Sequence, residues 1–440
     1  MKKQPKQELA PEEAILPPEE AKDAEVIENS LLTKNQQLEI TVSGQSYINN
    51  IDNALKILHS NFNGNIWFDE FHQKYFTSYN FNDPDDFGKT TREWNKIDDL
   101  KLTVFMQREY NMSKMSDEIV NKAVRIHGYN HIKNEPKDWM NQLVWDGTPR
   151  IETFFIDCAG TKDTEYTRAV SKNFWIGIAA RIFSPGCKLD TMPILEGEQG
   201  ELKSTLLEVI AQDWHCAASH DLYSKDFFQG MHGKLIIEFA DLSSFNKAEV
   251  NIIKDILSRR IDFLRLPYAP IFQNFPRQSV FAGTTNNSTY LKDSTGARRF
   301  WPIKTGTINI QKAKDDREQL FAEALYLFKQ GEKWWLMPSE TKDEQEERRE
   351  IDPWEPIIYD YIYHKNETTT REILLNCLHI TEASQNRSEE IRVGNILRLF
   401  KWDRKQKRVG ESRQYVYFPV NTIIQPESEL PAESQITWED

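Results

Sequence analysis

The sequence predicts an α/β protein built around a central, mostly parallel sheet, and three observations lead to this prediction. Short apolar runs alternate with helical patterns between residues 151 and 345, as expected for parallel strands covered by helices. A loop with two glycines, Gly197 and Gly200, stands between one of these runs and a helical pattern. Two other apolar runs end in Glu238 and Asn286, polar side chains suited to phosphate chemistry.

Length and composition exclude several classes of protein. The chain has 440 residues, of which 39% are hydrophobic and 28% charged, values typical of a globular protein with more than one domain. The longest apolar run, Phe174–Ala180, is far shorter than the roughly 20 residues that span a bilayer. The N-terminus lacks the apolar core of a signal peptide, and the four cysteines form no Cys-x-x-Cys pair. We therefore expect a reduced, cytoplasmic protein without membrane contact or structural zinc.

The net charge of −13 argues at first against a nucleic-acid partner, but the charges are unevenly distributed. Residues 1–30 hold eight acids and four lysines, and residues 426–440 hold five acids and no base. Residues 390–413, by contrast, carry eight bases against three acids. A basic patch is therefore available near the C-terminus for contact with phosphates.

Composition and turn signals divide the chain into five segments. The N-terminal segment is rich in Pro, Glu, Lys and Gln, which predicts disorder, and turn residues at Asp146-Gly147 close the domain that follows. We expect a disordered acidic tail over residues 1–45, a small N-terminal α/β domain over 46–150, a P-loop core over 151–345, a winged-helix-like domain over 346–422 and an acidic tail over 423–440.

Local patterns predict the elements of the first two folded domains. Residues 66–76 are typical of a short hairpin, and Ser116 to Ile126 of a helix. In the core, helices are marked by Val170, Phe174 and Ile178, and later by Leu320, Ala324 and Phe328. Buried strands are predicted at Met192–Leu195, Leu235–Phe239 and Val280–Thr284.

The C-terminal domain follows a winged-helix pattern of two helices, a basic loop and a strand. Thr370 is the expected cap of a helix that carries Ile373, Leu374 and Cys377. A second helix places Ile391, Ile396, Leu397 and Phe400 on one face, and Tyr415–Phe418 form the strand.

The loop before the helical pattern carries the strongest chemical signal; it reads Gly197, Glu198, Gln199, Gly200, Glu201, Leu202, Lys203, Ser204, Thr205. Backbone amides of such a loop surround phosphates, and the helix N-terminus favours negative charge. We expect Lys203 to reach the β- and γ-phosphates of ATP and Ser204 to hold Mg²⁺. Leu202 replaces the usual glycine, at a cost of about 1–2 kcal/mol if the loop needs a positive φ. The alternative is an ordinary strand, turn and helix with a surface lysine.

Polar residues after the next two apolar runs would complete a phosphoryl-transfer site. Glu238 and Asp241 follow one strand, where one acid would hold Mg²⁺ and the other would orient or deprotonate water. Glu238 is the better metal ligand, although the two roles are exchangeable. Asn286 would position water beside the γ-phosphate. Arg298 or Arg299 would act as an arginine finger on a neighbouring subunit, unless it is a structural arginine stacked on Trp301.

A set of short motifs in a fixed order resembles the virulence-associated protein E family. The match covers roughly residues 50–340, and its motifs are Trp145-Asp-Gly, Ala180-Arg181, Pro185-Gly-Cys-Lys188, Glu196-Gly-Glu-Gln-Gly200, Arg265-Leu-Pro-Tyr268, Gly283-Thr-Thr-Asn286 and Thr295-Gly-Ala-Arg-Arg-Phe-Trp-Pro302. The family consists of phage and mobile-element proteins similar to superfamily 3 helicases. The resemblance implies a P-loop ATPase that assembles as a ring, commonly a hexamer, and works with a separate primase in DNA replication. It matches Lys203 and Ser204 to the nucleotide loop, Glu238 to the Mg²⁺ acid and Asn286 to the sensor.

Two regions are candidates for DNA contact. The family resemblance implies a pore hairpin at Ile261–Tyr268, where Arg265 would meet phosphate and Tyr268 would stack on a base of single-stranded DNA, or else both would belong to an ATPase interface or core. In the C-terminal domain the candidates are Arg398, Arg404, Lys405, Lys407 and Arg408, which would bind DNA backbone, dock a protein or form a solvated face.

These observations favour an ATP-driven DNA helicase or translocase of a phage or mobile element, in a bacterial or phage-infected cell. The alternative is a non-catalytic DNA-binding initiator or loader with a degenerate nucleotide site, which Leu202 supports. A regulatory or anti-phage effector that uses the same ATPase frame is a third interpretation.

Overall fold

The computed structural model describes residues 38–41, 44, 46–80, 91–218, 221–222, 224–265, 271–287, 290, 297–339, 341–348, 351–409 and 412–420. The chain divides into two compact units, residues 1–349 and 350–440. Within the described ranges, every helix is too short or too polar to cross a bilayer.

The first elements of unit 1 form a small α/β layer. Its members are α2 (Ile51–Phe62), β1 (Ile66–Asp69), β2 (Lys74–Thr77), β3 (Arg92–Glu93), α3 (Lys96–Glu109), α4 (Asp117–Tyr129), β4 (Ile132–Lys133) and α5 (Glu135–Gln142). The strands lie in the order β3-β2-β1-β4, with β1 antiparallel to β2 and parallel to β4. The predicted hairpin is therefore confirmed. The predicted helix is confirmed as α4, whose first turn Ser116 caps through its side chain.

The centre of unit 1 is a five-stranded sheet in which every neighbouring pair is parallel. Its order is β11 (Phe300–Lys304), β5 (Met192–Glu196), β10 (Val280–Thr285), β7 (Ile236–Phe239) and β6 (His215–Ala217). All residues of β5, β7 and β10 are buried, as their uninterrupted apolar runs predict for strands covered on both faces. The mixed α/β class with a mainly parallel central sheet is confirmed.

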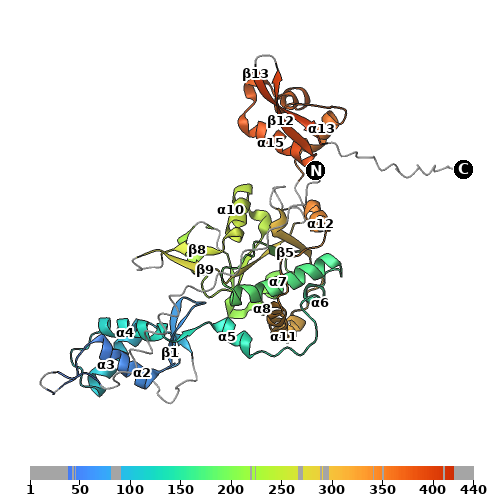
Figure 1. Ribbon diagram of the computed structural model, residues 1–440. Helices are drawn as coiled ribbons and strands as arrows, with labels where there is room; N and C mark the ends of the chain where they lie inside the picture. The colour runs from blue at the N-terminus through green and yellow to red at the C-terminus, as the bar shows by residue number, and fades with distance from the viewer. Residues whose placement is uncertain are drawn as a thin grey trace, which may run out of the picture. The chain divides into compact units, whose positions relative to one another are not determined.

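Helices cover this sheet and give it a continuous core. They are α6 (Phe154–Ala159), α7 (Glu165–Phe183), α8 (Lys203–Ala211), α9 (Lys225–Gly230), α10 (Lys247–Ser258), α11 (Ile310–Lys329) and α12 (Thr341–Glu347). Figure 1 shows α7, α8 and α11 grouped beside the sheet. The predicted helical faces of α7 and α11 meet in one hydrophobic cluster, which includes Trp175 and Phe321 in edge-to-face contact.

A two-stranded antiparallel ribbon, β8 (Ile261–Leu264) and β9 (Gln273–Pro276), extends from the core between α10 and β10 (Figure 1). Its base is fixed by a buried ion pair. Arg277 donates from Nε to Asp262 at 2.9 Å and from a second guanidinium nitrogen to the same carboxylate. Both side chains are almost fully buried, so each charge depends on the other for compensation.

Unit 2 contains α13 (Trp354–Ile362), α14 (Thr370–Glu372) continued by a π-turn (Ile373–Cys377), α15 (Arg387–Leu399), β12 (Trp402–Val409) and β13 (Ser412–Pro419). Its core gathers apolar residues from α13, the π-turn, α15 and both strands, including Ile358, Leu374, Leu397 and Tyr417. The strand predicted at Tyr415–Phe418 is confirmed within β13.

Three details of unit 2 differ from the sequence-based expectations. Thr369, not Thr370, caps α14, because its side chain accepts a hydrogen bond from the backbone N–H of Glu372. Ile391 is 53% exposed, because the buried face of α15 consists of Val393, Gly394, Ile396 and Leu397. The basic stretch after α15 is strand β12 and not a loop, because all eight of its residues pair with β13.

Replacing Arg277 by Met should lower the free energy of unfolding of unit 1 by about 3–5 kcal/mol, because Asp262 would remain buried without its partner. Chemical denaturation measures this change. The matched control is Arg259→Met, which removes the exposed pair with Asp255 and should cost less than about 1 kcal/mol. Equal losses for the two variants would show that the ribbon base does not depend on the buried pair.

Candidate functional site

Sheet topology brings the predicted phosphate-chemistry residues to one edge. Strands β5, β10 and β7 are parallel neighbours, so their carboxyl ends lie side by side. The Gly197–Thr205 loop follows β5, Asn286 follows β10, and Glu238 lies in β7 opposite Ala282 of β10. Gly197 and Asn286 are 89 positions apart in the sequence, and the fold brings both close to the start of α8.

Lys203 turns inward from the first position of α8 and is only 6% exposed. Its Nζ donates to the carbonyl oxygens of Gly197 at 2.8 Å and Glu198 at 2.6 Å, and to Oδ1 of Asn286 at 3.2 Å. Burial lowers the pKa of Lys203, and the carboxylates of Glu201 and Glu238 act in the opposite direction. The ammonium group therefore connects the loop to the end of β10.

Glu238 is the most highly connected carboxylate at this edge. Ser204 donates from Oγ to its Oε1 at 2.6 Å, and Thr284 donates to the same oxygen at 2.8 Å. Nε2 of His215 lies 3.2 Å from its Oε2. Burial alone would raise the pKa of Glu238, but the hydrogen bonds from His215, Ser204 and Thr284 outweigh burial and lower it. The carboxylate is thus held ionised beside the hydroxyl of Ser204, a residue that is otherwise exposed.

The loop itself holds one residue in an unfavourable backbone conformation. Leu202 caps α8 with φ 63° and ψ 21°, the left-handed region that glycine adopts at no steric cost, and its side chain is 49% exposed. Gly200 also has a positive φ and open space around it. At Gly197 a Cβ atom would lie 2.2 Å from Oε2 of Glu201 and 2.3 Å from Oγ1 of Thr305, so any other residue would require these side chains to move. That Oε2 atom is buried and has no hydrogen-bond partner.

Three other residues predicted for this site, Asp241, Gln199 and Thr205, lie apart from the contacts of Lys203 and Glu238. Asp241 lies beyond β7 with φ 48°, is exposed, and accepts a hydrogen bond from Ser243. Gln199 is exposed and Thr205 is half-buried. The described contacts of these three residues do not include Lys203 or Glu238.

The two adjacent arginines have different surroundings. The side chain of Arg298 is 74% exposed, and a guanidinium nitrogen lies 4.0 Å from Asp190. Arg299 donates twice to Oγ of Ser258 on α10, at 3.1 and 3.0 Å. Arg299 is therefore tied to its own subunit, whereas Arg298 extends into solvent.

The candidate DNA-contact residues lie on two elements. Arg265 is exposed at the end of β8, and Tyr268 lies outside the described residues. In unit 2, Arg398 is on α15, and Arg404, Lys405, Lys407 and Arg408 are on β12. All five side chains of this second group are exposed.

Sequence reasoning missed several residues that shape the site. Thr284 and His215 contact Glu238 only because of the strand register, and no short-range pattern connects them. Beneath the loop, Glu196 accepts hydrogen bonds from Tyr290 at 2.6 Å and from Nε of Arg348 at 3.1 Å. Burial raises the pKa of Glu196, and Tyr290 and Arg348 oppose that shift.

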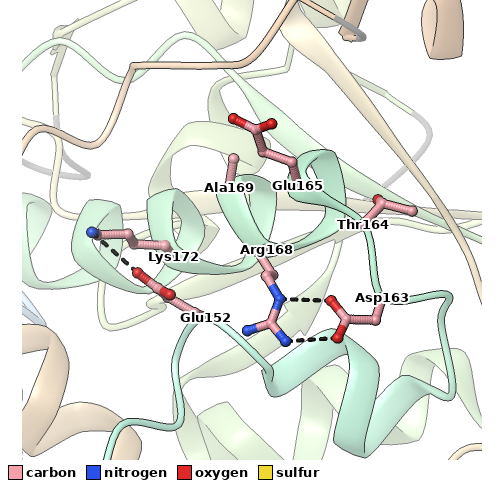
Figure 2. Close-up of a pocket in the computed structure, with 7 residues that line it drawn as sticks. All are labelled: Glu152, Asp163, Thr164, Glu165, Arg168, Ala169 and Lys172. Atoms are coloured by element: carbon pink, nitrogen blue, oxygen red, sulfur yellow. Dashed lines mark hydrogen bonds and ion pairs between the residues drawn. The ribbon is translucent and has the colours of Figure 1, made fainter.

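A separate pocket of about 600 Å³ lies at the start of α7 (Figure 2). Its lining includes two ion pairs, in which Arg168 binds Asp163 through two nitrogens and Lys172 lies 3.2 Å from Glu152. None of its lining residues belongs to the loop or contacts Glu238. Across the described ranges, no group of three His, Cys, Asp or Glu side chains is arranged to hold a metal ion.

Comparison with protein families matches residues 140–352 to the virulence-associated protein E-like domain. A search of curated proteins finds no match. Among solved structures, an apo structure of the NrS-1 C-terminal region is 13% identical, with a TM-score of 0.47, over 84% of this chain and 98% of that one. A second apo form of the same region is 14% identical, with a TM-score of 0.45, over 84% of this chain and 99% of that one.

Replacing Leu202 by Gly should raise the free energy of unfolding by about 1 kcal/mol, because glycine adopts the left-handed conformation without a clash. The control is Thr205→Gly inside α8, which should lower the free energy by about 1 kcal/mol. Denaturation midpoints measure both. A loss of stability in both variants would mean that Leu202 is not strained.

Replacing Thr284 by Val should lower the free energy of unfolding at neutral pH by about 1–3 kcal/mol, because Glu238 loses a hydrogen-bond donor. The lowered pKa of Glu238 contributes stability above its usual value of 4.5, and this stability is lost as pH falls through the lowered value. The variant brings the pKa of Glu238 closer to its usual value, so it should lose less stability than wild type as pH falls from neutral to below 4.5.

The control for this measurement is Thr285→Val on the same strand, because Oγ1 of Thr285 contacts Asn287 and not Glu238. Thr285→Val should keep the wild-type dependence on pH. The account of Glu238 fails if Thr284→Val also keeps it.

Proposed function

Residues 140–352 match the virulence-associated protein E-like domain, and from this likeness we propose that the chain is an ATP-dependent DNA helicase or translocase. We propose that it acts in DNA replication of a phage or mobile genetic element. The observation that carries the proposal is the convergence of Lys203, Ser204, Glu238 and Asn286 at one edge of the parallel sheet.

In this proposal the Gly197–Thr205 loop is a P-loop that binds ATP. Lys203 already directs its Nζ toward two carbonyl oxygens of the loop, and phosphate oxygens would accept these hydrogen bonds more strongly. Ser204 and Glu238 supply the hard oxygen ligands that Mg²⁺ prefers, 2.6 Å apart. When bound, Mg²⁺ would neutralise charge on the phosphates. Asn286, exposed beside Lys203, would orient the attacking water without adding negative charge.

The surroundings of the two arginines support one of them as the arginine finger. A finger must leave its own subunit and reach charge that develops in a neighbour's site. Arg298 is largely exposed, whereas Arg299 is held by Ser258. We therefore assign Arg298 as the finger and Arg299 as the residue that fixes the turn, in a ring that we propose to be a hexamer.

DNA would contact the β8–β9 ribbon and unit 2. Arg265 at the end of β8, together with Tyr268, would bind one strand in the pore of the ring. Unit 2 would act as a winged helix that binds duplex through its basic residues, and a primase from another chain would supply primers.

A second candidate is a non-catalytic DNA-binding initiator or loader. The left-handed conformation of Leu202 and the unpartnered Oε2 of Glu201 favour it, because both could weaken nucleotide binding in the loop. Such a protein would assemble with ATP but would not hydrolyse it.

ATP turnover by mixed subunits tests the proposed function. Lys203→Ala and Arg298→Ala should each reduce turnover by at least about 100-fold, because one loses phosphate binding and the other loses the finger. Mixing the two variants should restore up to about a quarter of wild-type turnover, because an intact Lys203 then faces an intact Arg298 across some interfaces.

Arg299→Ala, the matched control, should reduce turnover much less than Arg298→Ala, because Arg299 would fix the turn without reaching the neighbouring site. Wild-type turnover by Lys203→Ala would end the ATPase assignment. Nucleotide-dependent assembly of the wild type without turnover would support the initiator instead.

A further inference from the structure

The positive charge of unit 2 is concentrated on the ribbon β12–β13. Residues 402–419 carry five cations, namely Arg404, Lys405, Lys407, Arg408 and Arg413, against two acids. The whole chain, by contrast, has a net charge of −13. The ribbon is therefore a local exception to the acidity of the protein.

The described residues of the far half of the ribbon add nothing to the unit's hydrophobic core, and Lys407 pairs with the exposed Glu367 at 2.6 Å. Trp402, Val416 and Tyr417 are buried at its base. Beyond them, residues 406–408 and 413–415 are exposed. The ladder has eight pairs and is about 27 Å long, and only its base contributes residues to the unit's core. Hydrophobic burial does not explain why the chain maintains such a long ribbon.

Cations lie on both faces of the ribbon. Residues directly opposite each other in an antiparallel ladder share a face. One face carries Arg408 opposite Arg413, and also Arg404, whose guanidinium lies 4.1 Å from the ring centre of Tyr415. The other face carries Lys405 and Lys407. A ribbon that lay flat on a partner would present only one of these faces.

Helix α15, which precedes the ribbon, is poorly suited to be the main DNA-binding element. Its first turn contains Glu389 and Glu390, and carboxylates at a helix N-terminus repel phosphate. Arg392 is engaged by both carboxylate oxygens of Asp352, at 2.7 and 2.6 Å, and lies over the ring of Trp354. Arg398 is exposed at the opposite end of the helix.

We infer that the β12–β13 ribbon, and not α15, is the main duplex-binding element of unit 2, and that it enters the major groove of DNA. The inference deepens the proposed function and rests on it. The major groove is about 12 Å wide and admits a two-stranded ribbon, whereas the minor groove is about 6 Å wide. A ribbon inside the groove has phosphates on both sides, which matches cations on both faces.

The test is binding of the full chain to a blunt duplex without nucleotide, measured by fluorescence anisotropy over a range of salt concentrations. The triple variant Lys405→Gln, Arg408→Gln, Arg413→Gln should bind about tenfold more weakly or worse, and the slope of log affinity against log salt should fall by about 2–3. Guanine N7 atoms, which face the major groove, should be protected from methylation by wild type and not by the variant.

A matched control removes three cations of unit 2 outside the ribbon: Arg371→Gln, Arg387→Gln, Lys401→Gln. It should weaken binding by less than about threefold and leave the slope within about 1 of wild type. A charge-conserving ribbon variant, Lys405→Arg, Arg408→Lys, Arg413→Lys, should bind within about threefold of wild type, which excludes misfolding as the cause of the loss.

Equal losses in the ribbon variant and the control would overturn the inference. So would equal weakening of single-stranded and duplex binding, unprotected N7 atoms, or no rescue by the charge-conserving variant. The binding assay contains no nucleotide and the turnover assay needs no duplex, so the inference and the ATPase assignment can fail separately.

Discussion

The carboxylate of Glu238 is the interaction on which the candidate site depends. It lies in a fully buried strand and stays ionised because hydroxyl groups from α8 and β10 and the ring of His215 on β6 surround it. A buried charge with these partners fixes the relative positions of three parallel strands and the helix after the loop. Lys203 makes a second connection from that helix to the end of β10. The geometry of the candidate site and the stability of the fold are therefore coupled at the same few atoms.

The sequence was most informative where structure depends on neighbouring residues. Uninterrupted apolar runs predicted β5, β7 and β10, and the glycine-containing loop predicted the start of α8. The contacts of Thr284 and His215 with Glu238 could not be predicted, because they depend on the register of strands that are far apart in the chain. The contact of Arg348 with Glu196 could not be predicted either, because the two residues are 152 positions apart in the sequence.

The C-terminal unit shows where sequence patterns mislead. Residues 402–409 are mostly charged and lack the alternation of a half-buried strand, so they read as a loop. They form a strand because β13 supplies a full ladder of backbone partners while the unit's core covers only the base. A strand exposed on both faces gains little from burial, and its charge is then the feature that calls for a functional explanation.

The central claim is that ATP binds between Lys203 and Glu238, and that an arginine from a neighbouring subunit completes the site. Electron cryomicroscopy of the protein with Mg²⁺ and a non-hydrolysable ATP analogue tests this claim most directly. The account predicts a ring with one nucleotide in each Gly197–Thr205 loop and Arg298 of the adjoining subunit directed at its γ-phosphate. Rings or monomers whose loops stay empty at saturating nucleotide would contradict it.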